Sequence, residues 1–206
     1  MGNRRVIVLG STNPGKLREL RRLLGDLPVE LHGLGDYPEA KPPEETGQTF
    51  AENARLKATS LARQLDRWVL GEDSGLCVDA LGGRPGVRSA RYAGEDATDE
   101  ANTAKLLEEL ADVDAPRRTA AYVSVVVIAS PRAVLAETEG RCEGRIARRP
   151  RGQGGFGYDP VFFYPDLGAT FAQVSAEAKN SVSHRGQALR RLVGRLPDLL
   201  AAAADD

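Results

Sequence analysis

Apolar residues follow two periods along this chain, one typical of buried strands and one of amphipathic helices. The run from Arg5 to Leu9 is apolar after its first residue and ends at Gly10, which predicts a buried strand. Leucines at 17, 20, 23 and 24 recur at helical spacing and predict a helix over 16–24. Residues 29–34 alternate apolar and polar side chains, as a half-buried strand does. The chain therefore opens as strand, loop, helix and strand.

A second helix is marked by its cap as well as by its apolar face. Thr49 and Glu52 form a capping box, and apolar residues at helical spacing continue to about Asp66. We expect Arg55 and Lys57 on the exposed face of this helix.

The middle of the chain is rich in strand signals. Two short strands, 68–71 and 76–78, are predicted on either side of an acidic turn at 72–75. The β-branched run 119–129 and its return at 134–141 predict a hairpin, which we interpret as an antiparallel insertion.

The remaining elements complete an α/β pattern. Thr98 is expected to cap a helix that ends near Ala111, 161–164 reads as a strand, and apolar residues over 182–196 predict one C-terminal helix. Strands that alternate with helices, together with a hairpin, predict an α/β fold on a mixed sheet. A length of 206 residues favours a single domain over 1–206.

Composition narrows the class of protein. A hydrophobic fraction of 41% with 28% charged residues is typical of a globular protein, and a net charge of -1 gives no basic excess for nucleic acid. Arg4 and Arg5 precede only four apolar residues, so we expect no signal peptide, no membrane span and a cytoplasmic location. Cys77 and Cys142 form no motif and are assigned no role.

The first loop has the composition of an anion site. Ser11-Thr12-Asn13-Pro14-Gly15-Lys16 lies between a predicted strand and a predicted helix, where backbone N–H groups, the helix dipole and a lysine favour phosphate. Residues 10–16 also spell G-x-x-x-x-G-K, but Leu17 stands where a P-loop has Ser or Thr. Taken alone, the segment could equally be a plain connection.

Two acidic pairs are candidates for a metal site. Glu44-Glu45 precedes the capped helix and Glu72-Asp73 follows a buried strand. Carboxylates brought together repel unless a cation lies between them, and Mg²⁺ is held by one or two carboxylates plus substrate phosphates. The alternative is that these residues are solvated loop acids. This alternative is favoured for Glu44, as good as the metal site for Glu45, and disfavoured for Asp73.

Two further segments suit a purine base. Phe156 follows a glycine-rich segment that leaves its ring open for stacking. The alternative is a core aromatic, which fits Phe156 equally well and Tyr158 better. Lys179, His184 and Arg185 lie near the start of the last helix, where cations oppose the helix dipole. An anionic or carbonyl-bearing ligand would explain them.

Taken together, the motifs resemble the inosine/xanthosine triphosphate pyrophosphatase family from about Val6 to Leu196. They are Ser-Thr-Asn-Pro-Gly-Lys (11–16), Glu-Glu-Thr-Gly-Gln-Thr-Phe-Ala-Glu-Asn-Ala (44–54), Glu-Asp-Ser-Gly-Leu (72–76), Gly-Gly-Arg-Pro-Gly-Val-Arg-Ser-Ala-Arg-Tyr (82–92), Phe-Gly-Tyr-Asp-Pro (156–160) and Ser-His-Arg-Gly (183–186). One departure is Glu72, where bacterial relatives often have Asp.

The resemblance implies an elongated mixed sheet with flanking helices, two lobes around a cleft, a homodimer, and Mg²⁺-dependent hydrolysis of ITP, dITP and XTP to the monophosphate and pyrophosphate. It assigns the triphosphate to Ser11, Thr12, Asn13, Pro14, Gly15 and Lys16, general-base and metal roles to Asp73 with Glu45, a substrate contact to Ser74, and the sugar and base to Phe156, Gly157, Tyr158, Asp159, Lys179, His184 and Arg185. Whether Glu44 or Glu72 also reaches the metal stays open.

Two other functions remain possible from the residues alone. Gly10 to Lys16 could serve a P-loop kinase or NTPase, and the arginines in 145–151 could belong to a non-enzymatic nucleotide- or RNA-binding protein.

Overall fold

The structure is a computed structural model, and it describes residues 4–203. Its strands form one seven-stranded sheet in the order β2-β1-β3-β4-β5-β6-β7. The strands are β1 (Arg5–Leu9), β2 (Val29–Gly33), β3 (Trp68–Val78), β4 (Thr119–Ala129), β5 (Val134–Ile146), β6 (Phe162–Tyr164) and β7 (Ala169–Thr170). The helices are α1 (Pro14–Leu24), α2 (Phe50–Leu65), α3 (Asp99–Glu109), α4 (Ala176–Val182), α5 (His184–Val193) and α6 (Leu196–Ala202).

The sheet is mixed, as predicted. β1 pairs in parallel with β2 and with β3, whereas β6 pairs antiparallel with β5 and with β7. The predicted hairpin strands are β4 and β5, but they lie in the middle of the sheet, so our interpretation of them as an insertion is wrong. A run of buried β-branched residues fits a central strand that is covered on both faces.

The described chain divides into two compact units. The first comprises the segment up to Asp73, Val125–Glu139 and the segment from Ala188; the second comprises Ser74–Ser124 and Gly140–Gln187. β3, β4 and β5 each contribute residues to both units.

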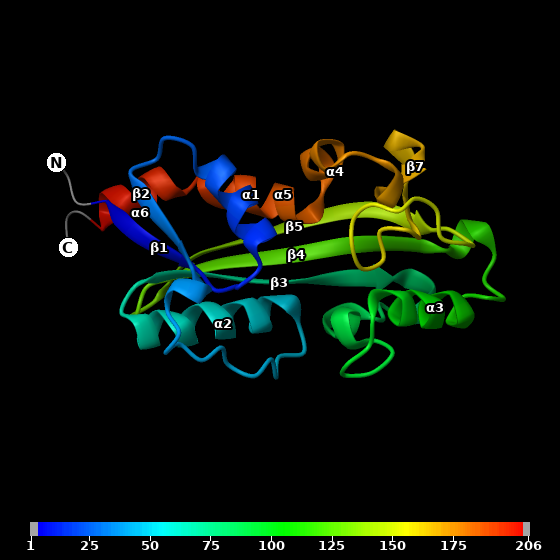
Figure 1. Cartoon of the computed structure of the whole chain (residues 1–206), viewed down its shortest axis with the longest axis horizontal. Helices are drawn as coiled ribbons and strands as arrows, with labels where there is room; N and C mark the ends of the chain where they lie inside the picture. Colours follow the sequence, from blue (N-terminus) through cyan, green and yellow to red (C-terminus); the bar gives the residue numbers. More distant parts are fainter. Residues whose placement is uncertain (1–3, 204–206) are drawn as a thin grey trace. The chain divides into compact units, whose positions relative to one another are not determined.

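The first unit has three layers, and the alternation of side chains along its strands explains them. Val8 packs with Ala54, Ala58 and Leu61 of α2 on one face of the sheet. Ile7 packs on the other face, where α1, α5 and α6 bury leucines against the sheet (Figure 1). Successive side chains of a strand point to opposite faces, so one buried strand supplies both cores.

The second unit has a core of its own, rich in aromatic residues. Tyr122 of β4 packs against Phe162 with ring centroids 4.6 Å apart, and Phe171 packs against Phe162 at 4.9 Å. Leu106 and Leu110, near the end of α3, complete this core. Thr98 caps α3 as predicted, because its side chain accepts a hydrogen bond from the N–H of Ala101.

Two predicted elements differ from the structure. The two short strands around an acidic turn are one continuous strand, β3. The single C-terminal helix is three helices, and the first break falls at Ser183, where the backbone is extended and the Ser183 hydroxyl accepts from the N–H of Gly186. A serine that bonds to a backbone N–H in this way starts a new helix instead of continuing the old one.

Candidate active site

The predicted phosphate loop connects β1 to α1, and Asn13 organises it. The Asn13 side chain caps α1 by accepting from the N–H groups of Gly15 at 2.8 Å and Lys16 at 3.3 Å. We expected these N–H groups to be available to an anion, and this expectation is wrong because Asn13 already satisfies both. The Asn13 N–H donates to the Ser11 oxygen at 3.2 Å, which leaves the Ser11 proton able to donate elsewhere. The Ser11 hydroxyl and the Lys16 ammonium are therefore candidate donors of this loop to an anion.

Lys16 has a carboxylate partner of its own. Its Nζ lies 3.3 Å from Oε2 of Glu72, whose side chain is only 4% exposed. Leu17, the residue that departs from the P-loop motif, packs into the core of the first unit. A P-loop requires a hydroxyl at this position to bind its metal, and Leu17 supplies none.

β3 continues past the end of β1, and this overhang carries the acidic residues. Leu9 is opposite Leu70, and the N–H of Gly10 donates to the Leu70 carbonyl at 2.8 Å. Two residues further along β3, the Glu72 carbonyl accepts from Lys57 Nζ at 2.9 Å. Open α/β sheets bind ligands at the carboxyl ends of their parallel strands, so the carboxyl end of β1 and the adjoining part of β3 are the expected place for a site.

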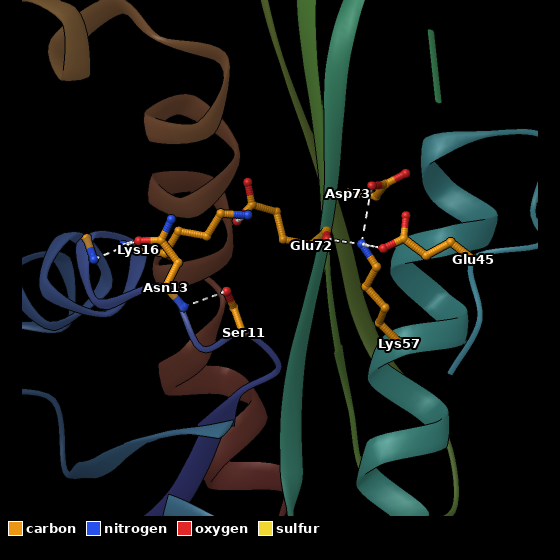
Figure 2. A network of polar contacts seen from close by, with 8 residues as sticks. Ser11, Asn13, Lys16, Glu45, Lys57, Glu72 and Asp73 are labelled. Atoms are coloured by element: carbon orange, nitrogen blue, oxygen red, sulfur yellow. Dashed lines mark hydrogen bonds and ion pairs between the residues drawn. The ribbon is translucent and has the colours of Figure 1, made fainter. Parts of the chain in front are cut away.

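Glu72 and Asp73 point to opposite sides of β3. Figure 2 shows Glu72 on the side of Lys16, and Asp73 on the side of α2 with Lys57 and Glu45. Lys57 Nζ lies 2.9 Å from Oε1 of Glu45 and 3.2 Å from Oδ1 of Asp73. The two carboxylates thus share one ammonium group.

Lys57 is the functional candidate that sequence reasoning missed. We expected its side chain on the exposed face of α2, but it is only 15% exposed and lies between the acids. A signal was present, because Asn53 and Lys57 are four residues apart beside the apolar stripe and interrupt it with polar groups.

Burial governs the protonation of Asp73. Desolvation raises its pKa above the ordinary value, while the Lys57 charge and a hydrogen bond from Asn53 lower it and Glu45 raises it further. A carboxylate whose pKa is raised by desolvation is a stronger base than a solvated one.

Several of these groups line one pocket of about 300 Å³. Its lining includes Ser11, Thr12, Lys16, Glu45, Lys57 and Glu72. The phosphate loop and the acidic residues, predicted separately from the sequence, therefore meet in the first unit. Glu44 is exposed, whereas Glu45 contacts the Lys57 ammonium that Asp73 also contacts.

The acids fit a hard cation in number and chemistry. Among residues 4–203, no group of three or more His, Cys, Asp and Glu side chains is arranged to hold a metal ion. Magnesium needs fewer protein ligands, since one or two carboxylates plus substrate phosphates hold it in many phosphate-processing sites. Glu45 and Asp73 are close enough to share the Lys57 ammonium and can supply these two carboxylates.

The predicted base-binding residues gather in the second unit around Phe156. The Phe156 side chain is 60% exposed, and Lys179 Nζ lies 4.2 Å from its ring centroid. Lys179 also forms an ion pair with the buried carboxylate of Asp159, which accepts from the Phe156 N–H at 2.9 Å. The Arg185 guanidinium carbon lies 5.9 Å from the same ring centroid. An open aromatic face with two cations beside it suits an electron-rich base.

Other predicted residues take different positions. Tyr158 is buried and its hydroxyl donates to the Ser89 carbonyl at 2.8 Å, so its side chain packs in the core of the second unit. Its assignment to the substrate stays a prediction. His184 is also buried, and its ring stacks on Tyr122 with centroids 4.8 Å apart. Gly157 and Phe156 line a pocket of about 450 Å³. Ser74 is half-buried on β3.

Fold and site define an α/β protein with a candidate phosphate loop and paired carboxylates at the ends of its parallel strands. Within this class, the chain belongs to the Ham1 family, whose sequence profile matches residues 7–195. A dITP/XTP pyrophosphatase of Geobacillus kaustophilus (strain HTA426) is 52% identical over 186 residues, which cover 90% of this chain and 91% of that protein.

Two more comparisons agree with this assignment. A dITP/XTP pyrophosphatase of Streptococcus pyogenes serotype M1 is 48% identical over 93% of this chain, and the match spans 59% of that longer protein. The structure of a HAM1 protein from Coxiella burnetii superposes with a TM-score of 0.89 at 42% identity, covering 94% of this chain and 99% of the other. The predicted fold and family are therefore confirmed. Within residues 4–203, none of the helices has the length and apolar character to span a bilayer.

Proposed function

We propose that this protein hydrolyses the non-standard purine nucleotides ITP, dITP and XTP to the monophosphate and pyrophosphate, in a Mg²⁺-dependent reaction. The observation that carries the proposal is the pairing of Glu45 and Asp73 through Lys57, because Glu45 and Lys57 line the same pocket as Lys16. The family membership and the printed activity of two relatives support it.

The chain's own groups account for most of the chemistry. When bound by Glu45 and Asp73, magnesium would neutralise charge that develops on the phosphate oxygens. Asp73 orients the attacking water and accepts its proton, a role that its raised pKa favours. Lys16 and the Ser11 hydroxyl stabilise the departing pyrophosphate.

Base selection is a matter of hydrogen bonding. Hypoxanthine and xanthine carry a 6-oxo acceptor where adenine carries a 6-amino donor. Donors from Lys179, His184 or Arg185 satisfy an oxo group and oppose an amino group, and a site built on such pairing discriminates by roughly 10⁴-fold or more. Phe156 offers a stacking surface to any purine.

Product analysis tests the proposal directly. The protein is incubated with ITP, dITP, XTP, GTP and ATP, with Mg²⁺ or with EDTA, and the products are separated by chromatography. We expect monophosphate and pyrophosphate in equal amounts from the first three, and none with EDTA. Release of orthophosphate and a diphosphate, transfer to an acceptor, or salt-sensitive RNA binding without turnover would each contradict it.

We also propose a homodimer, which the family resemblance implies. Sedimentation equilibrium is expected to give twice the chain mass of 22.1 kDa. The mass of a single chain at micromolar concentration would rule this assembly out. The cytoplasmic location stays a prediction of the sequence.

A further inference from the structure

Asn53 connects the two acidic segments of the candidate active site. It lies in the first turn of α2 and is 1% exposed. Its side-chain Nδ2 donates to Oδ2 of Asp73 at 3.1 Å, and its Oδ1 accepts from the backbone N–H of Gly47 at 2.8 Å. Gly47 is two residues from Glu45, so one amide group links the loop of one acid to the side chain of the other.

The loop can only approach Asn53 this closely because residue 47 is a glycine. A Cβ atom at Gly47 would lie 2.6 Å from Oδ1 of Asn53 and 2.7 Å from Cβ of Glu52, which is closer than real side chains come. The next two N–H groups of the loop, those of Gln48 and Thr49, donate to Oε2 of Glu52 at 2.7 and 3.1 Å. Three successive N–H groups thus hold the loop to the first turn of α2.

A second asparagine in the chain shows what a purely structural version looks like. Asn102 is the fourth residue of α3, as Asn53 is of α2, and it is also buried. Its Oδ1 accepts from the N–H of Ala93 at 2.7 Å, and its Nδ2 donates to the Ala90 carbonyl at 3.1 Å. Both partners of Asn102 are backbone groups. Asn53 keeps the loop bond but directs its donor at a carboxylate.

The two oxygens of Asp73 are bonded in different ways. Oδ1 lies 3.2 Å from the Lys57 ammonium, which also contacts Glu45 and the Glu72 carbonyl, whereas Oδ2 accepts from the planar amide of Asn53. An amide whose other end is held by the Gly47 N–H has one plane and one donor direction, so it fixes the orientation of the carboxylate more narrowly than the rotatable donors of an ammonium group do.

We infer that Asn53 is a positioning residue: with Gly47 it forms a latch that sets the orientation of Asp73 and its spacing from Glu45. The inference rests on the proposed function for its catalytic meaning. Substrate contacts are not required of Asn53, because it acts through Asp73. Its loss should therefore affect the chemical step more than nucleotide binding.

The kinetic test compares Asn53→Ala with Asn102→Ala as the matched structural control. For XTP with saturating Mg²⁺, we expect kcat to fall at least about 10-fold in Asn53→Ala with KM changed by less than about threefold. Asn102→Ala should lower the melting temperature to a comparable extent and leave kcat within about twofold of wild type. Equal kcat for both variants, or a loss confined to KM, would overturn the inference.

Two further variants separate the arms of the latch. Asn53→Asp keeps the acceptor for the Gly47 N–H but, when ionised, cannot donate to Asp73. It should lose at least as much kcat as Asn53→Ala. Gly47→Ala breaks the loop arm from the other side. If the two residues act together, kcat of the double variant Gly47→Ala/Asn53→Ala should lie within about twofold of kcat of the less active single variant. Multiplying losses would mean that the two residues act separately.

Amide hydrogen exchange reads the latch without any turnover. The Gly47 N–H should be protected in wild type and in Asn53→Asp, and should exchange at least about 10-fold faster in Asn53→Ala. This result stands even if the wild-type protein releases no pyrophosphate, which would defeat the proposed function and not the latch. Unchanged Gly47 exchange in Asn53→Ala would defeat the latch itself.

Discussion

Asp73 carries opposite requirements for stability and function at the scale of one residue. Burial raises its pKa, so the folded protein holds the Asp73 proton more tightly than the unfolded chain does. Between the ordinary and the raised pKa, the contribution of this group to the free energy of unfolding falls as pH rises. At neutral pH the ionised Asp73 therefore destabilises the folded protein. Function, however, needs the ionised base.

Asp73→Asn should therefore lose activity without losing stability. We expect turnover to fall by at least about 10²-fold because the base and one metal ligand are removed, with a melting temperature at neutral pH equal to or above that of wild type. Calorimetry and pyrophosphate release measure the two effects. Near-normal activity with Mg²⁺ would remove Asp73 from the mechanism.

Lys57 should be needed for the same pair of acids. Lys57→Met keeps the length of the side chain but leaves Glu45 and Asp73 without the ammonium that both contact. We expect turnover to fall by about 10²-fold, because the unscreened carboxylates repel and Asp73 protonates more readily. Arg55→Met, which changes an exposed neighbour on α2, is the control. Equal activity of the two variants would assign Lys57 a structural role only.

Lys16 should act on every nucleotide alike, because its charge meets phosphate and ignores the base. Lys16→Ala is expected to lower kcat/KM for ITP, XTP, GTP and ATP by one common factor, while the exposed Arg18→Ala on the same helix changes little. A change confined to base preference would contradict this role.

β3 shows at the scale of elements what sequence patterns can and cannot reveal. Caps are local, so Thr49 and Thr98 predicted two helix starts that the structure confirms. Glu72 and Asp73 were predicted in a turn because acids are depleted in buried strands. They remain in β3 because Lys16 and Lys57, from α1 and α2, partner them. No local pattern contains those two contacts.

The same limit explains the other differences. The motifs of the site were recognised one by one, but which side chains meet depends on tertiary contacts, so Lys57 was expected on the exposed face of α2 and not between the acids. Ser183 carries a hydroxyl that caps α5, and an apolar pattern that runs through the break does not show it.

Gly71 should be essential to the contact between β3 and α2. A Cβ atom there would lie 2.5 Å from the Ala54 carbonyl oxygen and 2.6 Å from the Ala58 nitrogen, both backbone atoms that cannot turn aside. Gly71→Ala is expected to destabilise the protein by about 2 kcal/mol or more and to lower turnover. Gly35→Ala, where nothing lies within 4 Å, is the control in urea unfolding. Equal stabilities would show that the strand shifts at no cost.

At the scale of the whole molecule, the phosphate and acid groups belong to one compact unit and the base-side groups to the other. Substitution of the base-side donors should change base preference. Arg185→Ala or His184→Ala is expected to cost ITP and XTP at least about 10-fold more than ATP in kcat/KM.

Phe156→Ala should behave differently, because stacking is available to every base. We expect a common loss on the order of 1 to 3 kcal/mol for ITP, XTP, GTP and ATP. Kinetics for each variant with the four nucleotides measure both effects. If Arg185→Ala and His184→Ala lowered all four in proportion, base choice would have to come from backbone donors.

The opposite directions of Glu72 and Asp73 also constrain how the gene can change. Neighbouring strand residues face opposite ways, so adding one codon between those for Leu70 and Glu72, or deleting the codon for Gly71, would turn each carboxylate toward the other's lysine. Single substitutions at these positions alter one charge, whereas a length change exchanges both sides at once. We therefore expect such a length change to lower turnover further than replacement of either carboxylate alone, which a library of one-codon insertions and deletions assayed for pyrophosphate release can measure.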